Sequence, residues 1–453
     1  MRSISLPPQS DTKTDGDFHR DILPHLETCL AVTGNPISPA RHGMGKLRVR
    51  VAMILQPTLL LLLRDQICIH AKCGWVFAER GYFDKAAAHL QIVRDMLVKL
   101  AGEGDEKTMN ATLGLAGVLW GLGRLEEGIK LGRSVVETRT RIYGPGDERT
   151  LGSMNRLGQS YWLNGQYCEA LELQEITSTR MKKNLGEHHP ATLDALDNLG
   201  VTLSSWYRYQ ESLDAHTFVL AARERSLGET HLDTLTTKCN LATALLELGR
   251  PDEANVAMTE VYTQRQHQLG KEHPWTLWAV SDLCKIKIRL GHFDEAEEML
   301  NWGLSAATRS LGDNHLGVLM GRGLLAQIYT GTGRLEEAEK LALDTIRRVE
   351  SSRGIVHPDC VYGLWRLARL YVLRGCRAKA VDTCELGLQR AGVRISRKHP
   401  LAKDLEMLLD RLKDPLSTAD ELLDLKEGRF GTPLVGKETL RENKVGDSSV
   451  RAG

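Results

Sequence analysis

The sequence predicts an all-α, right-handed α-solenoid of about eight 42-residue helical hairpins. The main observation is a repeat: LGEHHPATL (Leu185 to Leu193) recurs as LGETHLDTL, LGKEHPWTL and LGDNHLGVL, each 42 residues after the last. The second is size, because 453 residues exceed what one compact core usually supports. The third is composition, since only 5% of residues are aromatic while small and charged residues abound. A fixed period in a chain of this length predicts a stack of repeats.

Each repeat is predicted to be two helices joined by a tight turn. Counted from the Thr of each recurring Thr-Leu pair, positions eight and twenty hold small residues in all eight repeats. Small side chains at both positions allow the two helices to approach closely. Position fifteen is Gly in every repeat except one, where it is Tyr207, and Gly suits the end of the first helix. We expect the stack to be least regular at Tyr207. We also expect irregularity at Val318 and Cys360, which replace the Thr of the recurring Thr-Leu pair.

The LGxxHPxTL segment connects one hairpin to the next. Its Gly is expected to end the second helix and its Pro to occupy the first turn of the following one. The Thr of that turn is expected to help satisfy free backbone amides. One His per repeat cannot build a shared metal site, so we interpret the recurring histidines as structural: His189, His231, His273, His315, His357 and His399.

The repeats divide the chain into three parts. Residues 1–50 are predicted to be a partly disordered N-terminal segment with a short helix near 21–33. Residues 51–413 form the array, with a charged capping helix at its C-terminal end. Residues 414–453 alternate charge with Gly, Pro and Ser, which predicts a disordered charged tail.

Several function classes are disfavoured by the composition. A net charge of +1 gives no electrostatic footprint for nucleic acid. The longest apolar run, Val51 to Leu63, is too short to insert across a membrane. The nine cysteines are scattered and never spaced as CxxC, which favours reduced thiols in a cytoplasmic protein. No catalytic or nucleotide-binding motif occurs in a sequence context that supports it. We therefore expect no catalytic residue, no metal, no cofactor and no enzyme activity.

The repeat pattern resembles a known family. The TL, LG, G-x-[FYL] and LGxxHP elements at 42-residue spacing resemble the tetratricopeptide repeats (TPR) of kinesin light chains. They resemble even more closely the repeat halves of fungal and bacterial NB-ARC or NACHT (STAND) signalling ATPases, with Glu169 to Gly200 the best match. The resemblance covers about four-fifths of the chain.

The resemblance has limits that bear on function. Kinesin light chains carry an N-terminal heptad coiled coil, and no stretch here sustains heptads. STAND proteins carry a GxxxxGK[ST] phosphate loop, whereas RHGMGKL (Arg41 to Leu47) lacks the first Gly and has Leu47 in place of the hydroxyl residue. The chain therefore resembles a sensor half without its ATPase.

The resemblance implies that the first helix of each hairpin lines a concave groove. Position six is typically Asn in kinesin light chains, where its amide pairs with a peptide backbone. Here that position is Asn198 and Asn240, flanked by Arg156 and Asp282, with Arg366 further on. Four tryptophans at groove-directed positions are candidate apolar anchors: Trp120, Trp162, Trp278 and Trp365.

The leading hypothesis is a non-enzymatic protein-protein interaction scaffold that binds a peptide or partner protein in the groove. The alternative is a free-standing or truncated sensor half of a STAND-type signalling ATPase. Some tryptophans could instead pack between repeats. The sequence identifies neither the partner nor the oligomeric state.

Overall fold

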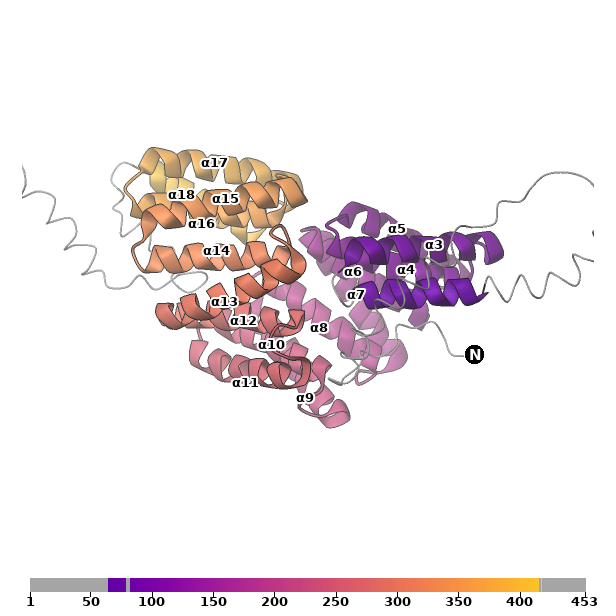
Figure 1. Ribbon diagram of the computed structural model, residues 1–453. Helices are drawn as coiled ribbons and strands as arrows, with labels where there is room; N and C mark the ends of the chain where they lie inside the picture. The colour runs from indigo at the N-terminus through magenta and orange to yellow at the C-terminus, as the bar shows by residue number, and fades with distance from the viewer. Residues whose placement is uncertain (1–63, 79–81, 415–416, 418–453) are drawn as a thin grey trace, which may run out of the picture. The chain divides into compact units, whose positions relative to one another are not determined.

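The structure is a computed structural model that describes residues 64–78, 82–414 and 417 (Figure 1). The expected helix near 21–33, the first part of the array at 51–63 and residues 418–453 of the expected tail lie outside these residues. Every regular element in the described part is a helix.

Residues 64–78 form a helix, and sixteen further helices follow it in the described chain. Their bounds are α3 Phe83–Ala101, α4 Glu106–Gly121, α5 Leu125–Tyr143, α6 Glu148–Leu163, α7 Tyr167–Leu185, α8 Pro190–Ser205, α9 Tyr209–Leu227, α10 Leu232–Glu247, α11 Pro251–Leu269, α12 Pro274–Arg289, α13 Phe293–Leu311, α14 Leu316–Gly331, α15 Leu335–Arg353, α16 Pro358–Leu373, α17 Arg377–Arg394 and α18 Pro400–Lys413.

These helices confirm the predicted hairpins. The helix at 64–78 packs on α3 through Cys73, Phe77 and Ala86, and each even-numbered helix from α4 to α16 is followed by its odd-numbered partner. This gives eight helix pairs with α18 alone at the end, so the fold is an all-α solenoid. We call the first helix of a pair helix A and the second helix B.

The predicted close approach and turn are also confirmed. A Cβ added at Gly128, position twenty, would lie 3.0 Å from the carbonyl oxygen of Ala116 at position eight, so the helices leave no room for a larger residue. The position-fifteen glycines among the described residues adopt positive φ, as at Gly123 (72°) and Gly249 (79°). Only glycine adopts this backbone region without strain.

The expected irregularity at Tyr207 is wrong. Tyr207 takes φ 59°, and the amide of Arg208 donates to the carbonyl of Leu203 as that of Arg124 does to Leu119. Helices α14 and α16, which carry Val318 and Cys360, are each 16 residues long, as α8 and α10 are. The turn at Tyr207 and the helix lengths at Val318 and Cys360 therefore keep the period, while the expectation about how the repeats stack at Val318 and Cys360 stays a prediction.

The recurring histidines cap the A helices. In each case Nδ1 accepts a hydrogen bond from the amide two residues on, which is the geometry of an N-cap. The distances are 3.3 Å for His189 and 3.2 Å for His231, His273, His315, His357 and His399. The structural interpretation of these histidines is confirmed, and they supply the acceptor that we expected from Thr.

The Thr of the recurring Thr-Leu pair lies in a different environment. The hydroxyl oxygens of Thr150, Thr192 and Thr234 are buried without a hydrogen-bond partner among the described residues, and the hydroxyl of Thr276 donates backwards to the carbonyl of Gly270. The expectation that Thr helps to satisfy the free amides is therefore wrong, because the His three residues earlier already accepts from them.

We predict that His231→Ala lowers the free energy of unfolding by about 1 kcal/mol, since α10 loses its cap. His231→Asp should retain most of the stability, because Asp105 and Asp147 cap α4 and α6 from the same repeat position. Urea denaturation of the three proteins tests this. Equal losses in both variants would contradict a capping role.

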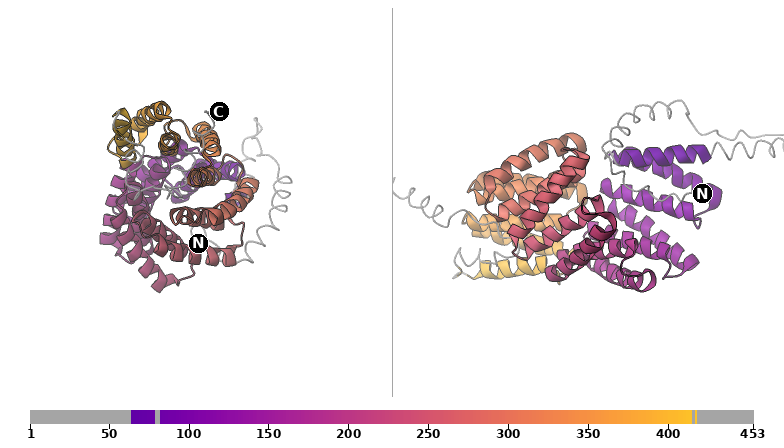
Figure 2. Two further views of the ribbon diagram at one scale, coloured as in Figure 1. Left: turned by 90° about the vertical axis from the view of Figure 1, so that its left-hand side faces the viewer. Right: turned by 90° about the horizontal axis from the view of Figure 1, so that it is seen from below.

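The chain forms two compact units, Met1–Ser153 and Met154–Gly453, and the boundary falls inside α6. Within the second unit the A helices of neighbouring repeats contact each other, α8 with α10, α10 with α12 and α12 with α14. Figure 2 shows these helix pairs following a curved path. The A helices therefore lie on the inner side of the curve, as the resemblance implied.

The curve of the second unit is closed by contacts between its first and last repeats. Nε2 of His357 lies 3.2 Å from the carbonyl oxygen of Leu163, and Nη1 of Arg394 donates to Oδ1 of Asn164 at 3.1 Å. The ring of His399 lies 5.2 Å from that of Tyr167 and 6.0 Å from that of Tyr207. These contacts join residues more than 190 positions apart, and we call them the closing contact.

Candidate functional site

The inner face carries a ladder of polar contacts between neighbouring A helices. A residue at position five of one repeat pairs with position six of the next, which is 43 residues later. Nδ2 of Asn198 donates to Oδ1 of Asn155 at 3.1 Å, and Nδ2 of Asn240 donates to Oδ2 of Asp197 at 3.4 Å. The ladder continues with Cys239 to Asp282 and with Arg366 to the carbonyl of Gly323.

The ladder holds most of the predicted position-six residues. Asn198 also accepts a hydrogen bond of 2.7 Å from Gln159, so both ends of its amide are oriented. Asp282 binds Nζ of Lys285 at 2.7 Å. Arg156 is exposed on α6. The ladder was not predicted. The sequence shows which residue stands at each repeat position, but not which residue of the neighbouring repeat its side chain contacts.

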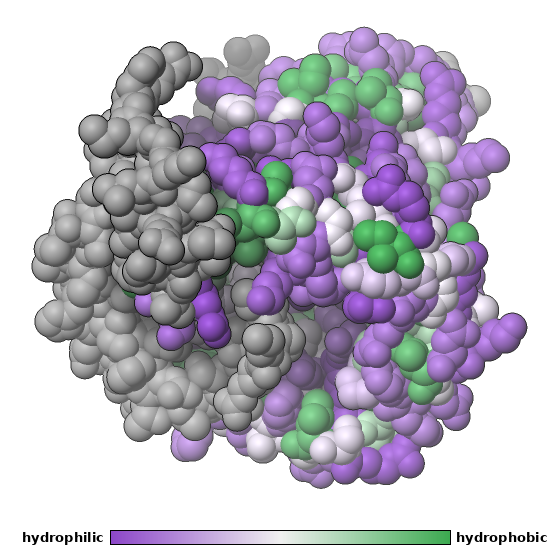
Figure 3. Space-filling view, turned by 90° about the vertical axis from the view of Figure 1, so that its right-hand side faces the viewer, coloured by the Kyte–Doolittle hydropathy of each residue, from purple (hydrophilic) through white to green (hydrophobic). Residues whose placement is uncertain are grey.

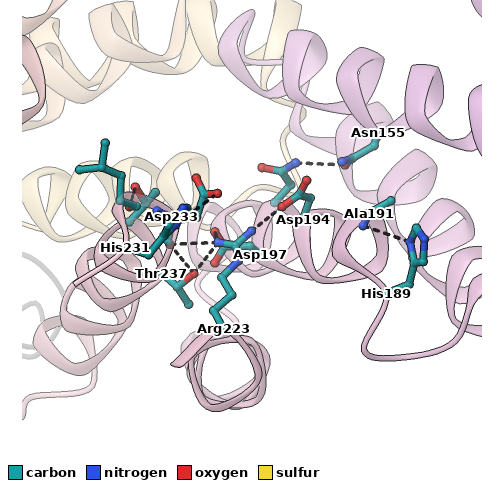
Figure 4. Close-up of polar contacts among 12 residues, drawn as sticks. Asn155, His189, Ala191, Asp194, Asp197, Arg223, His231, Asp233 and Thr237 are labelled. Atoms are coloured by element: carbon teal, nitrogen blue, oxygen red, sulfur yellow. Dashed lines mark hydrogen bonds and ion pairs between the residues drawn. The ribbon is translucent and has the colours of Figure 1, made fainter. Parts of the chain in front are cut away.

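A buried ionic cluster lies beneath the ladder, centred on Arg223 of α9 (Figure 4). Its guanidinium bonds both Asp194 and Asp197 of α8 and reaches Thr237 of α10 at 2.6 Å. Nδ1 of His216 lies 2.8 Å from the other oxygen of Asp197. One side chain therefore ties three successive helices together.

Most of the cluster is shielded from solvent, whereas Asp194 is exposed at its edge. His216 is 1% exposed, and Asp197 and Arg223 are each 6% exposed. Burial alone would raise the pKa of Asp197, but the hydrogen bond from His216 and the charge of Arg223 bring that pKa below its usual range. A carboxylate and imidazole this deeply buried cannot reach a substrate, so we interpret the pair as structural.

The four tryptophans differ in environment. Trp120 lies in the first unit and is half-buried. Trp162 is half-buried and donates from Nε1 to the hydroxyl of Ser205 at 2.7 Å, and Trp278 is half-buried on α12. Trp365 is only 4% exposed and stacks on Tyr362. Trp365 also belongs to a core cluster that includes Ala338 and Ile346 of the preceding repeat, which agrees with the packing between repeats that the sequence left open.

A cavity of about 390 Å³ opens beside Trp365 and Arg366. Its lining comes from α10, α12, α14, α15 and α16, and includes Glu247, Lys285 and Arg289. This cavity brings together two of the predicted site residues, Trp365 and Arg366. Asn198 and Asn240 are not among its lining residues.

Glu247 is a cavity residue that was not predicted. It stands at position thirteen of its repeat, and the same position in the next repeat is Arg289. Their charged groups lie 3.9 Å apart, between Oε2 of Glu247 and Nη1 of Arg289. Opposite charges at one position of adjacent repeats were a signal in the sequence, but that position was not among those assigned to the groove.

Further features concern the exposed surface, the metal-ligating side chains and the cysteine thiols. On the face drawn in Figure 3, the described hydrophobic residues form small patches separated by hydrophilic ones. The described residues include no group of His, Cys, Asp and Glu that could hold a metal ion, and no described helix has both the length and the hydropathy to cross a membrane. Burial raises the pKa of the Cys284 and Cys384 thiols to about 12.

Comparisons with known proteins identify the repeats. Tetratricopeptide repeat models match residues 107–175, 149–216, 208–266 and 318–359. A search of curated proteins finds no significant match. The chain therefore contains tetratricopeptide repeats.

Several solved structures are similar. Kinesin light chain-type TPR-like repeats from Podospora anserina share 25% identity with a TM-score of 0.38, over 44% of this chain and 95% of that one. A Rap protein complexed with competence and sporulation factor shares 12% identity with a TM-score of 0.50, over 77% and 98%. The apo quorum sensor NprR from B. thuringiensis shares 12% identity with a TM-score of 0.50, over 83% and 98%. The family models agree with the tetratricopeptide repeats that the sequence pattern resembles.

Proposed function

We propose that the chain is a non-enzymatic interaction scaffold that binds a peptide or partner protein along the inner face of the second unit. The observation that carries the proposal is the polar ladder at positions five and six. The ladder lies on the A helices, which face inward, and it fixes the side chains of Asn198 and Asn240. The Rap protein with the same fold was crystallised with a bound factor, which supports a ligand-binding use of the fold.

A side chain that is already oriented binds a ligand at lower entropic cost. An Asn amide has two N–H donors and an oxygen with two lone pairs. Asn198 uses one N–H toward Asn155 and accepts one bond from Gln159. One donor and one lone pair then remain on a fixed amide, which is the pair of groups that an extended peptide backbone requires.

The remaining predicted residues extend this surface. We propose that Trp162 and Trp278, both half-buried, give apolar contacts on either side of the two asparagines. Arg156 and the Asp282–Lys285 pair add charge of both signs. This arrangement favours a mixed-charge peptide over nucleic acid. Trp120 belongs to the first unit and is proposed as an apolar contact there.

The double variant Asn198→Ala, Asn240→Ala is expected to weaken partner binding at least tenfold, because each lost amide removes hydrogen bonds worth about 1 kcal/mol. The matched control is Gln266→Ala, Asn301→Ala, which changes two exposed amides on the B helices α11 and α13. Both variants and the wild type are used as baits in quantitative affinity purification from the native host.

Partners lost by the inner-face variant and kept by the control would support the proposal. Equal recovery of every partner by all three baits would refute it. A co-purifying ATPase that depends on Asn198 and Asn240 would favour the sensor alternative over a passive scaffold.

A further inference from the structure

The cavity beside Trp365 has an apolar interior. It extends from the inner face into the space between α14, α15 and α16, where Leu319, Leu324 and Ile346 line it. These side chains are at most 7% exposed, so the cavity reaches into the packed layer of the solenoid. Its volume of about 390 Å³ lies within the range of roughly 300–1,000 Å³ that is typical of small-molecule sites.

Small residues leave this space open. Position five holds Asn155, Asp197 and Cys239 in earlier repeats but Gly323 in α14. A Cβ added at Gly323 would meet only Nη1 of Arg366, at 3.7 Å. Protein interiors are otherwise close-packed, and a glycine inside a helix costs about 0.5–1 kcal/mol relative to alanine. A glycine beside an open cavity therefore suggests a use for the space.

The mouth of the cavity is positively charged. Four lining residues are cations, Lys285, Arg289, Arg366 and Arg369, against two carboxylates, Glu247 and Asp359. Lys285 is paired with Asp282 outside the lining, and Asp359 lies within 3.6 Å of both Arg353 and His357. Cationic residues therefore outnumber carboxylates among the lining residues.

Arg366 is the cation best placed to meet an anion. Its Nη1 donates to the carbonyl of Gly323 at 3.2 Å and its Nη2 to the hydroxyl of Tyr362 at 3.0 Å. Both acceptors are neutral oxygens, so these bonds hold the guanidinium without cancelling its charge. They use two of its five N–H groups, and a guanidinium binds a carboxylate through paired N–H donors.

We propose that this cavity binds a small organic carboxylate, with its apolar body between α14, α15 and α16 and its carboxylate at Arg366. The site shares the Arg366–Gly323 contact with the ladder but includes neither Asn198 nor Asn240, so the inference does not rest on the proposed peptide site.

The charge state of Glu247 bears on this binding. Burial raises the pKa of Glu247 to about 7, against the lowering effect of Arg289 and Lys285 from α12 and Arg366 from α16. Tyr207, from the α8–α9 turn, also faces its charge. Protonated Glu247 leaves the mouth more positive, so a bound anion is favoured as the pH falls through about 7.

The test uses the full-length protein and isothermal titration calorimetry with two carboxylates, decanoate and 4-phenylbutyrate. Decanol and decyltrimethylammonium serve as neutral and cationic counterparts of decanoate. We expect at least one carboxylate to bind with a Kd below about 1 mM. We also expect decanol and decyltrimethylammonium to bind at least tenfold more weakly than decanoate. Failure of both carboxylates to bind would overturn the proposal, and so would equal binding of decanol and decanoate.

Two variants locate the site. Gly323→Leu fills the cavity and is expected to abolish carboxylate binding, whereas Gly117→Leu, at a helical glycine of α4 with nothing within 4 Å, should leave it unchanged. Arg366→Met should weaken it roughly tenfold, whereas Arg225→Met, at an exposed arginine of α9, should have no effect. Thermal melting of each variant shows that it is folded. Unchanged binding by folded Gly323→Leu would refute the site.

Two further measurements distinguish binding in this cavity from binding elsewhere on the protein. Decanoate affinity should fall roughly fivefold from pH 6 to pH 8 and become independent of pH in Glu247→Gln; a flat profile in the wild type would contradict the assigned position of the carboxylate. The Asn198→Ala, Asn240→Ala variant should bind decanoate like the wild type, so that failure of the peptide site and failure of this site are distinguishable.

Discussion

Replacing Arg223 with Met is expected to lower the free energy of unfolding by roughly 3–5 kcal/mol, the usual loss when one partner of a buried ion pair is removed. Arg223 is the cation between Asp194 and Asp197, and its terminal nitrogens bond α8, α9 and α10 together. Met keeps the length of the side chain but leaves Asp197 buried with His216 and the Asn240 amide and without the charge of Arg223. Urea denaturation followed by circular dichroism measures the change.

The matched control for this loss is Arg225→Met on the same helix. Arg225 is exposed and donates only to the carbonyl of Ala221 within α9, so its replacement should cost less than about 0.5 kcal/mol. Adding Asp197→Asn to Arg223→Met removes the uncompensated charge and should recover part of the loss. Equal stability of the two arginine variants would show that the cluster does not hold the helices together.

The second large effect is expected at Gly165, where the closing contact is tightest. A Cβ at Gly165 would lie 2.1 Å from Cγ of Pro358, and a proline ring cannot rotate away. Gly165→Ala should therefore open the closing contact and lower the free energy of unfolding by about 3 kcal/mol, combining strain at positive φ with overpacking. Hydrogen exchange at the first turns of α16 and α18 should increase.

Gly249 provides the control for that variant. It occupies the same repeat position with φ 79°, and nothing lies within 4 Å of a Cβ added there. Gly249→Ala thus carries the backbone strain without the clash and should cost only about 1 kcal/mol. If the two alanine variants lose the same stability and α16 stays protected, the closing contact does not contribute to the fold.

The helix pairs were predictable because their signals are local and repeated. Gly at position fifteen and small residues at positions eight and twenty act within one hairpin, and each recurs in most repeats. The acceptor for the free amides was expected from the wrong residue for a physical reason. Thr and His both stand near the helix start, and Thr is a common cap, but only the His lies one residue before the helix, where its Nδ1 can reach the free amide.

The closing contact and the cavity could not be predicted in this way. Tyr207 looked like a defect in the turn, yet its ring lies against His399 nearly two hundred residues later. Trp365 stood at a groove-directed position, yet it is buried in the core cluster and stacks on Tyr362 from its own helix. The cavity depends on the summed volumes of side chains from α14, α15 and α16, and no single position of the period shows that sum.

Photo-crosslinking tests the central claim, that partners bind on the inner face of the second unit, most directly. Benzoylphenylalanine replaces either Gln327, which lines the cavity on helix A α14, or Val256, which is 70% exposed on helix B α11. Irradiation in native cells should give a discrete adduct from position 327 that disappears in the Asn198→Ala, Asn240→Ala background, and none from position 256. A partner crosslinked only from position 256 would contradict the account.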